Sequence, residues 1–184
     1  MRLEPIEKPE DWITRLGYWL SRRRLGKTPT PFKVFYARAP KLGWLAYQIS
    51  RTEEKALSID PGLGLLIHVQ ASAHNGCGFC VDIGRALAVQ RDVGLEKFEA
   101  LSAYRTSPLF SDRERAALDY TGEVTRDKRV SDATFEALRK HFSEREVVEI
   151  TWVNALANYY NLINVPLELE SDGLCAIALG SKKG

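Results

Sequence analysis

Several features are scarce or missing in this 184-residue sequence, and each absence excludes a class of protein. Charge of one sign is not in excess, because 26 basic residues stand against 24 acidic ones, so we expect no nucleic-acid partner. No apolar run reaches the length of a membrane span, and the N-terminus lacks the apolar segment of a secretory signal. We therefore expect a cytoplasmic protein with no membrane partner, in a compartment where thiols are kept reduced.

Cysteine is also scarce, since three residues in a chain of this length cannot form a disulfide framework. Cys77 and Cys80 form a CxxC pair, and Cys175 lies near the C-terminus. A structural zinc site needs four ligands, but a second CxxC or an HxxxH is missing, and the spacing of His68 and His74 follows no common zinc pattern. We expect no metal and no other cofactor, and we rank a redox pair above two structural cysteines and both above zinc.

The sequence also lacks the alternation of apolar and polar residues that is typical of strands. Helical periodicity covers nearly the whole chain. Helix starts are marked by a proline at 40 and by Ser-x-x-Glu capping boxes at 111 and 143. The sequence predicts an all-α fold of about eight or nine helices, which lie near residues 9–24, 40–55, 65–74, 77–91, 95–101, 111–125, 130–142 and 143–163.

The two ends of the chain raise separate questions. The first predicted helix has one apolar face and a basic C-terminal end. We expect the apolar face to pack against the body of the protein or a neighbouring subunit, with a membrane-surface helix as the alternative. A linker with two prolines follows at 26–33. The apolar face comprises Trp12, Leu16, Trp19 and Leu20.

The last long helix has few charges after Glu149, so we expect most of its surface to be buried. It carries a polar stripe that we expect to cap helix ends or to line a subunit contact, rather than to bind substrate. The stripe comprises Asn154, Asn158, Tyr159, Tyr160, Asn161 and Asn164.

The CxxC pair begins a predicted helix, a position with chemical consequences. Free N–H groups and the positive end of the helix dipole stabilise a thiolate there. A second thiol one turn away can then resolve a mixed disulfide or a sulfenic acid into an internal disulfide. A thioredoxin fold is excluded, because its CxxC follows a strand and the segment before Cys77 is helical. The alternative remains that both cysteines are inert core residues.

The succession of segments resembles the carboxymuconolactone decarboxylase-like, or AhpD-like, family. The resemblance covers roughly residues 30–170 and includes A-R-A-P-K-L, then L-L-I-H-V-Q-A-S-A-H-N-G ahead of C-G-F-C, then L-S-A-Y-R-T-S-P-L-F-S-D-R-E-R-A-A-L-D-Y and the final H-F-S-E-R-E-V-V-E-I-T-W-V-N-A-L-A-N-Y-Y-N-L-I-N-V. It implies an N-terminal arm and linker at 1–30, a helical domain at 31–170 and a C-terminal tail at 171–184. It also implies an antiparallel helical bundle that assembles into a homo-oligomer, a trimer or a hexamer.

The family divides into two branches. The alkyl hydroperoxidase branch uses its CxxC to reduce peroxides or to pass electrons, and the decarboxylase branch acts on a lactone without that pair. Because Cys77 and Cys80 are present, the resemblance places this chain nearer the first branch. It then implies that Cys80 is the nucleophile and Cys77 its resolving partner, with a peroxide or disulfide substrate and an unknown electron donor.

The chain departs from the peroxidase branch at two positions, where a glutamate and a histidine normally relay the proton that activates the thiol. Leu65 and Gly84 stand there instead, and neither can move a proton. His68, one turn after Leu65, is our first candidate for the base, and His74 the second. For both histidines a packed or hydrogen-bonded imidazole is the alternative, and Asp82 is interpreted as a first-turn charge that favours the helix dipole.

Three functions therefore stay open. The first is a thiol oxidoreductase of the AhpD-like kind, slow or specialised because the usual relay is missing. The second is decarboxylase-type lactone chemistry, for which the sequence offers no clear acid–base group. The third is a non-catalytic, redox-responsive oligomeric scaffold. Cys175 is interpreted as a tail or interface residue, with a third thiol of the relay as the alternative.

Overall fold

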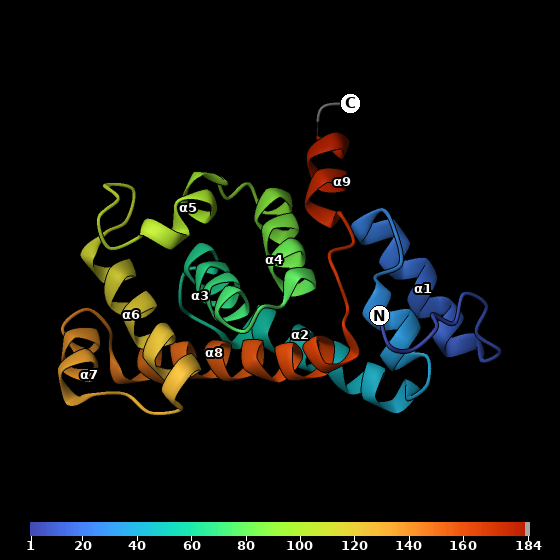
Figure 1. Ribbon diagram of the computed structural model, residues 1–184, viewed down its shortest axis with the longest axis horizontal. Helices are drawn as coiled ribbons and strands as arrows, with labels where there is room; N and C mark the ends of the chain where they lie inside the picture. Colours follow the sequence, from blue (N-terminus) through green and yellow to red (C-terminus); the bar gives the residue numbers. More distant parts are fainter. Residues whose placement is uncertain (183–184) are drawn as a thin grey trace.

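The computed structural model describes residues 1–182, which contain helices and no strand (Figure 1). Nine α-helices occur in this range, and they confirm the all-α class and the expected number. Three short helical segments join them: η1 (Phe32–Tyr36), η2 (Leu101–Ala103) and η3 (Val165–Leu167). The α-helices are α1 (Trp12–Leu25), α2 (Pro40–Ala56), α3 (Pro61–His74), α4 (Gly78–Gln90), α5 (Glu96–Glu99), α6 (Asp112–Asp127), α7 (Asp132–Arg139), α8 (Glu144–Asn164) and α9 (Leu174–Ser181).

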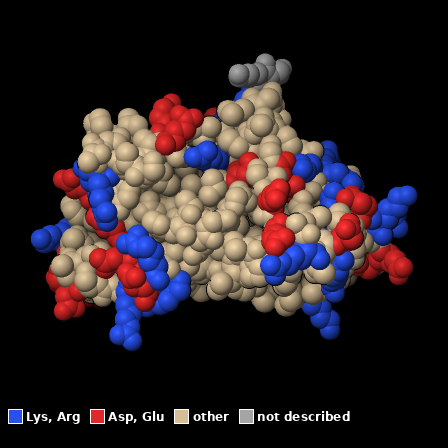
Figure 2. All heavy atoms as spheres, viewed as in Figure 1, with Lys and Arg blue, Asp and Glu red and all other residues tan. Residues whose placement is uncertain are grey.

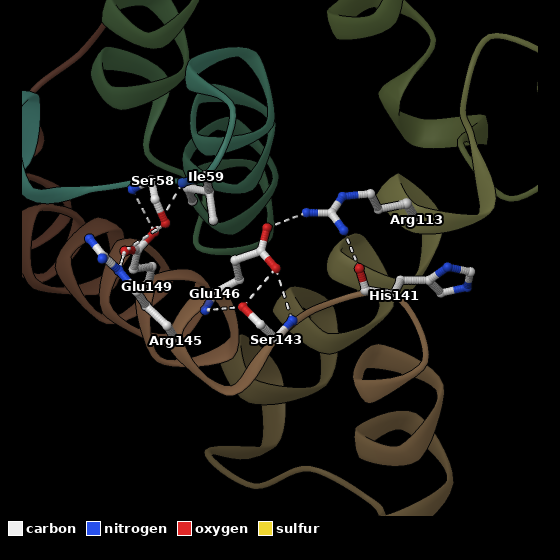
Figure 3. A network of polar contacts seen from close by, with 8 residues as sticks. All are labelled: Ser58, Ile59, Arg113, His141, Ser143, Arg145, Glu146 and Glu149. Carbon is white, nitrogen blue, oxygen red and sulfur yellow. Dashed lines mark hydrogen bonds and ion pairs between the residues drawn. The ribbon is translucent and has the colours of Figure 1, made fainter.

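Local sequence signals fix the helix starts. Both predicted capping boxes are present: Ser111 with Glu114 begins α6, and Ser143 with Glu146 begins α8. In each box the serine hydroxyl accepts the glutamate's backbone N–H while the glutamate carboxylate accepts the serine's N–H, so two otherwise unpaired donors are satisfied. Figure 3 shows the box at α8, where Arg113 of α6 also reaches Glu146.

The core is built around α3, which packs against α4, α6 and α8. Eight of its 14 residues are buried, as expected for a helix that is apolar on nearly every side. The turn at 75–77 reverses the chain, so α3 and α4 form a hairpin. Gly76 adopts a φ of 69° in this turn, a conformation that glycine reaches without strain.

The first helix packs through a different face from the one that the sequence predicts. Tyr18 and Ser21 are its buried residues, and the Tyr18 hydroxyl donates to the carbonyl of Ile6. The predicted apolar face is exposed within this single chain, so its packing against the body is wrong. The exposed side chains are Trp12, Leu16, Trp19 and Leu20.

Two segments are more regular than expected. The linker at 26–33 ends early, because a helical turn begins at Thr30 and continues into η1. Pro31 is compatible with this turn because the first residues of a helix need no N–H partner. The tail at 171–184 contains α9 as far as Ser181, which lies along α4 (Figure 1). Its last two residues lie outside the described range.

The expectation that most of α8 is buried is wrong. Seven of its 21 residues are buried, and they face α3, α4 and α6. The opposite face is apolar and exposed in the single chain, with Val148, Trp152, Tyr159 and Leu162 on it. The low charge of α8 therefore predicted an apolar helix surface, but not whether the single chain buries that surface.

Charged side chains of both signs lie interspersed at the two ends of the molecule, and the middle of the face in Figure 2 carries few of them. This face offers no extended region of one sign to attract a polyanion. No helix within residues 1–182 is both long and apolar enough to cross a membrane.

Candidate active site

The CxxC pair lies at the start of α4, as the sequence predicts. Cys77 is the N-cap residue of α4, and Cys80 is in its first turn. The two cysteines are joined in a disulfide, with their Cα atoms 5.3 Å apart. The Sγ of Cys77 accepts the backbone N–H of Cys80 at 3.3 Å, so a free helix-end donor is directed at this sulfur.

The second sulfur has a different donor. Asn164, the last residue of α8, directs its amide Nδ2 at the Sγ of Cys80 at a distance of 3.3 Å. The two sulfurs of the pair are therefore distinguished by their surroundings: Cys77 contacts a backbone amide of its own helix, and Cys80 contacts a side chain from another helix.

The C-terminal segment closes over the pair. Cys77 and Cys80 are only 1% and 2% exposed, and Leu174 and Ala178 of α9 pack in the same apolar cluster. Figure 1 shows this segment leaving the end of α8 and running to α9 beside α4. In the disulfide form the sulfurs are thus shielded from solvent by residues that follow α8.

Asp82 holds this segment in place. Its buried carboxylate accepts the backbone N–H groups of Asp172, Leu174 and Cys175 at 3.1, 2.8 and 2.9 Å. It therefore caps the start of α9, instead of serving only as a first-turn charge of its own helix. No local pattern indicates this role, because the carboxylate and the amides are about 90 residues apart in the chain.

His68 contacts the backbone of the pair. Its Nε2 lies 3.2 Å from the carbonyl oxygen of Cys80. A carbonyl can only accept, so Nε2 carries the hydrogen and Nδ1 is the basic nitrogen. Burial lowers the pKa of His68, against the opposing effect of this hydrogen bond, so the ring is neutral at pH 7. A neutral ring with a free basic nitrogen is compatible with the predicted role as a base, which stays a prediction.

The two positions of the missing relay are filled by packing. Leu65 is buried in the cluster that α3 forms with α4 and α6. At Gly84, an added Cβ would lie 2.5 Å from Cγ2 of Val69 and 3.1 Å from Cδ2 of His68. A histidine cannot enter this space without displacing α3, so the His68 ring occupies the neighbourhood where the relay histidine would stand.

Comparisons with known proteins agree with this geometry. Residues 45–123 match the model of the carboxymuconolactone decarboxylase family. The chain is 32% identical to the uncharacterized protein YnjA of Escherichia coli K12 over 96% of its own length and 97% of that protein. The chain belongs to the carboxymuconolactone decarboxylase/AhpD-like family.

Solved structures show the same fold. A protein of unknown function from Agrobacterium tumefaciens, named as a candidate AhpD antioxidant defence protein, is 29% identical, with a TM-score of 0.69 over 75% of this chain and 96% of that one. The debrominase Bmp8, in complex with 2,3,4-tribromopyrrole, has a TM-score of 0.82 at 18% identity over 98% of this chain and 97% of that one. At that identity the likeness concerns the fold alone.

Two candidates from the sequence remain, His74 as a second base and Cys175 as a third thiol. His74 is exposed and faces α6 near Arg126; burial and the charges of Arg126 and Arg105 lower its pKa. Cys175 packs beside the CxxC cluster, where burial, together with Asp82, raises the pKa of its thiol. A thiol with a raised pKa stays protonated at pH 7 and is a weak nucleophile.

The asparagine stripe of α8 turns inward, so the expectation that it caps helix ends or lines a subunit contact is wrong for its buried members. Asn161 donates to the hydroxyl of Ser72, and Asn75 donates to Asn161 and Asn158. These contacts fasten α8 to the end of α3. Asn154, which is fully buried, accepts the hydroxyl of Thr125 in α6.

Among residues 1–182, no group of three or more His, Cys, Asp or Glu side chains is placed to hold a metal ion. The groups that can take part in chemistry at this site are the two sulfurs, His68 and Asn164.

Proposed function

We propose that this chain is a thiol-dependent oxidoreductase of the AhpD-like branch, which reduces a peroxide or exchanges a disulfide through Cys77 and Cys80. The observation that carries the proposal is the disulfide at the start of α4, in which each sulfur receives its own hydrogen-bond donor. Two core cysteines without a redox role would need neither donor. Family membership supports an enzyme, and the likeness to the Agrobacterium tumefaciens protein, a candidate AhpD antioxidant defence protein, supports this branch.

In the proposed reaction the Cys80 thiolate attacks a peroxide oxygen. The O–O bond breaks, Cys80 becomes a sulfenic acid, and the leaving alkoxide takes a proton to form an alcohol. The Cys77 thiol then attacks the Cys80 sulfur and releases water, which gives the disulfide present in the structure. A dithiol reductant returns two electrons and restores the thiols, and its own sulfurs become a disulfide.

The missing relay predicts a slow peroxidase. Leu65 and the space at Gly84 supply no group to move protons between solvent and sulfur. The Nδ1 nitrogen of His68 is the base that we propose in its place. If His68→Ala leaves the reaction rate of the Cys80 thiol unchanged, His68 acts only by holding the Cys80 carbonyl.

The test is peroxide consumption by the reduced protein in the presence of a small dithiol. We expect turnover in wild type and in the matched control Cys175→Ser, and none in Cys80→Ser. Without the dithiol, reduced Cys77→Ser should stop after one equivalent of peroxide and keep a sulfenic acid on Cys80, because the thiol that resolves it is absent. Equal turnover in wild type and Cys80→Ser would refute the proposal.

Two other outcomes would redirect it. Conversion of a carboxymuconolactone-type substrate that survives loss of both cysteines would favour lactone chemistry, and no turnover with any substrate would favour a redox-responsive scaffold. We would add 2,3,4-tribromopyrrole to the panel because the debrominase shares the fold. Bromide release that depends on Cys80 would show that the two electrons of the thiol pair reduce a carbon–bromine bond instead of a peroxide.

We further propose that the chain works as a homo-oligomer, a trimer or a hexamer, in the cytoplasm. The exposed apolar faces of α1, α2 and α8 support an assembled state. A reducing compartment would allow the pair to cycle, because a dithiol donor is available there.

A further inference from the structure

The contact between Asn164 and Cys80 is the strongest unexplained feature of the site. Asn164 is 4% exposed, and its Nδ2 donates to the Cys80 sulfur at 3.3 Å. Its Oδ1 is also buried and accepts no hydrogen bond from any residue in the range 1–182. Burying an amide with one end unpaired is unfavourable, so such a group is retained where it has a task.

The surrounding helices hold this amide in position. Asn161, one turn earlier on the same face of α8, is hydrogen-bonded to Ser72 and Asn75 near the end of α3. The turn at 75–77 then leads directly to Cys77 and the start of α4. The donor and the sulfur thus stand on two elements that are fastened to the same end of α3, so the contact needs little rearrangement to persist.

The contact favours the charged form of the sulfur. Burial in an apolar cluster disfavours a thiolate, whereas an N–H donor directed at the sulfur stabilises it. Cys77 has such a donor in the backbone of α4. Without Asn164 the helix start alone would make Cys77 the better thiolate of the two, contrary to the roles that the family pattern implies.

We propose that Asn164 is a catalytic residue that stabilises the Cys80 thiolate and so selects Cys80 over Cys77 as the nucleophile. The inference rests on the proposed function. When a dithiol reduces the disulfide, two electrons enter the pair, Cys77 takes one proton from the donor, and the second proton leaves to solvent. Cys80 keeps the negative charge, held by the Asn164 amide. This role replaces part of what the missing relay would supply.

The test uses a chain in which Cys80 is the single thiol, Cys77→Ser with Cys175→Ser. The pKa of Cys80 is read from the ultraviolet absorbance of the thiolate, which requires no reagent to reach the buried sulfur. We expect Asn164→Ala to raise this pKa by about one unit, which is about tenfold less thiolate below the pKa. Asn164→Asp should raise it further, because its carboxylate adds a like charge.

Asn154→Ala is the matched control, because it removes a buried amide of the same helix that contacts Thr125 of α6 and no sulfur. It should leave the pKa of Cys80 unchanged. An unchanged pKa in Asn164→Ala, or an equal shift in Asn154→Ala, would overturn the proposal. If Asn164→Ala does not fold, as judged by its thermal melting, Asn164→Leu keeps a similar side-chain volume without a donor or a charge and carries the test.

A second measurement uses the reduced pair. Limited alkylation followed by mass spectrometry should label Cys80 first in wild type and Cys77 first in Asn164→Ala. Labelling of Cys77 first in both proteins would overturn the selection. If Asn164→Ala raises the pKa of Cys80 but wild type does not consume peroxide, the proposed function alone is refuted. If wild type consumes peroxide but Asn164→Ala leaves the pKa of Cys80 unchanged, the role of Asn164 alone is refuted.

Discussion

Two neighbouring helices of this chain, α2 and α3, differ sharply in what covers them. Eight of the 14 residues of α3 are buried, whereas none of the 17 residues of α2 is. Yet α2 is not a polar helix, because four large apolar side chains stand exposed along its first half: Leu42, Trp44, Leu45 and Tyr47. The rings of Trp44 and Tyr47 are stacked, with centroids 5.4 Å apart.

The single chain packs α3 into its core and leaves the apolar face of α2 exposed. The α3 helix is enclosed by α4, α6 and α8, so changes against it should alter the stability of the single chain. The α2 helix contributes little to that core, and its exposed apolar face is a surface that the proposed assembly would cover. Substitutions on the two helices should therefore have effects of different kinds.

The largest effect is expected at the interface of α3 and α4. Gly84→His restores the histidine of the peroxidase branch, but its Cβ would lie 2.5 Å from Val69. We expect the free energy of unfolding to fall by about 3 kcal/mol or more, without a gain in peroxidase activity, because α3 must shift. Denaturant unfolding measures the first effect and peroxide consumption the second.

Gly17→Ala is the control for this substitution. A Cβ at Gly17, in the middle of α1, meets nothing within 4 Å, so alanine should stabilise the chain by about 0.5–1 kcal/mol. A stable and more active Gly84→His protein would show that α3 can shift at this point. The contrast between a tightly packed α3 and an uncovered α2 would then fail.

The next effect concerns the connection between α2 and α3. Glu149 of α8 accepts the backbone N–H groups of Ser58 and Ile59 at 2.7 and 2.9 Å, and Arg145 at 2.8 Å (Figure 3). Burial by itself would raise the pKa of Glu149, but the hydrogen bonds from Arg145, Ser58 and Ile59 outweigh it and lower that pKa to about 2. The folded chain therefore favours the ionised carboxylate of Glu149 over its protonated form.

A lowered folded pKa stabilises the fold above the unfolded value of 4.5, and this contribution is lost as the pH falls toward 2. We expect Glu149→Gln to lower the free energy of unfolding by on the order of 2 kcal/mol at pH 7 and by far less at pH 2 to 3. Urea unfolding across this pH range measures it. An equal loss at pH 7 and at low pH would exclude the carboxylate as the cause.

A smaller effect is expected where α9 covers the pair. Asp82→Asn keeps one acceptor for the three N–H groups at the start of α9 but removes the charge, which should cost about 1 kcal/mol. The expected result is several-fold faster alkylation of reduced Cys80, since α9 opens more often. Asp132→Asn, at the exposed start of α7, is the control. Equal rates in both variants would show that α9 does not limit access.

Local signals in the sequence predicted what depends on neighbours along the chain. The capping boxes at Ser111 and Ser143, and the CxxC at a helix start, each need only a few consecutive residues. The partners of Asp82 and Asn164 lie more than 80 residues away, and no periodicity shows which face of α8 meets which sulfur. Apolar patterning marked the faces of α1, α2 and α8 that the single chain leaves exposed, without saying what they contact.

The smallest effect on the single chain is expected on α2. Trp44→Glu combined with Leu45→Glu should change the stability of the monomer by less than about 0.5 kcal/mol, because neither side chain is buried. Gln48→Glu adds charge to the same helix without removing apolar surface, and so serves as the control. We expect light scattering to give an oligomeric mass for wild type and the control, and a smaller mass for the double variant. If all three proteins have the mass of an oligomer, the contact is made by α1 or α8; if all three are monomers, the exposed face of α2 must bind a different partner.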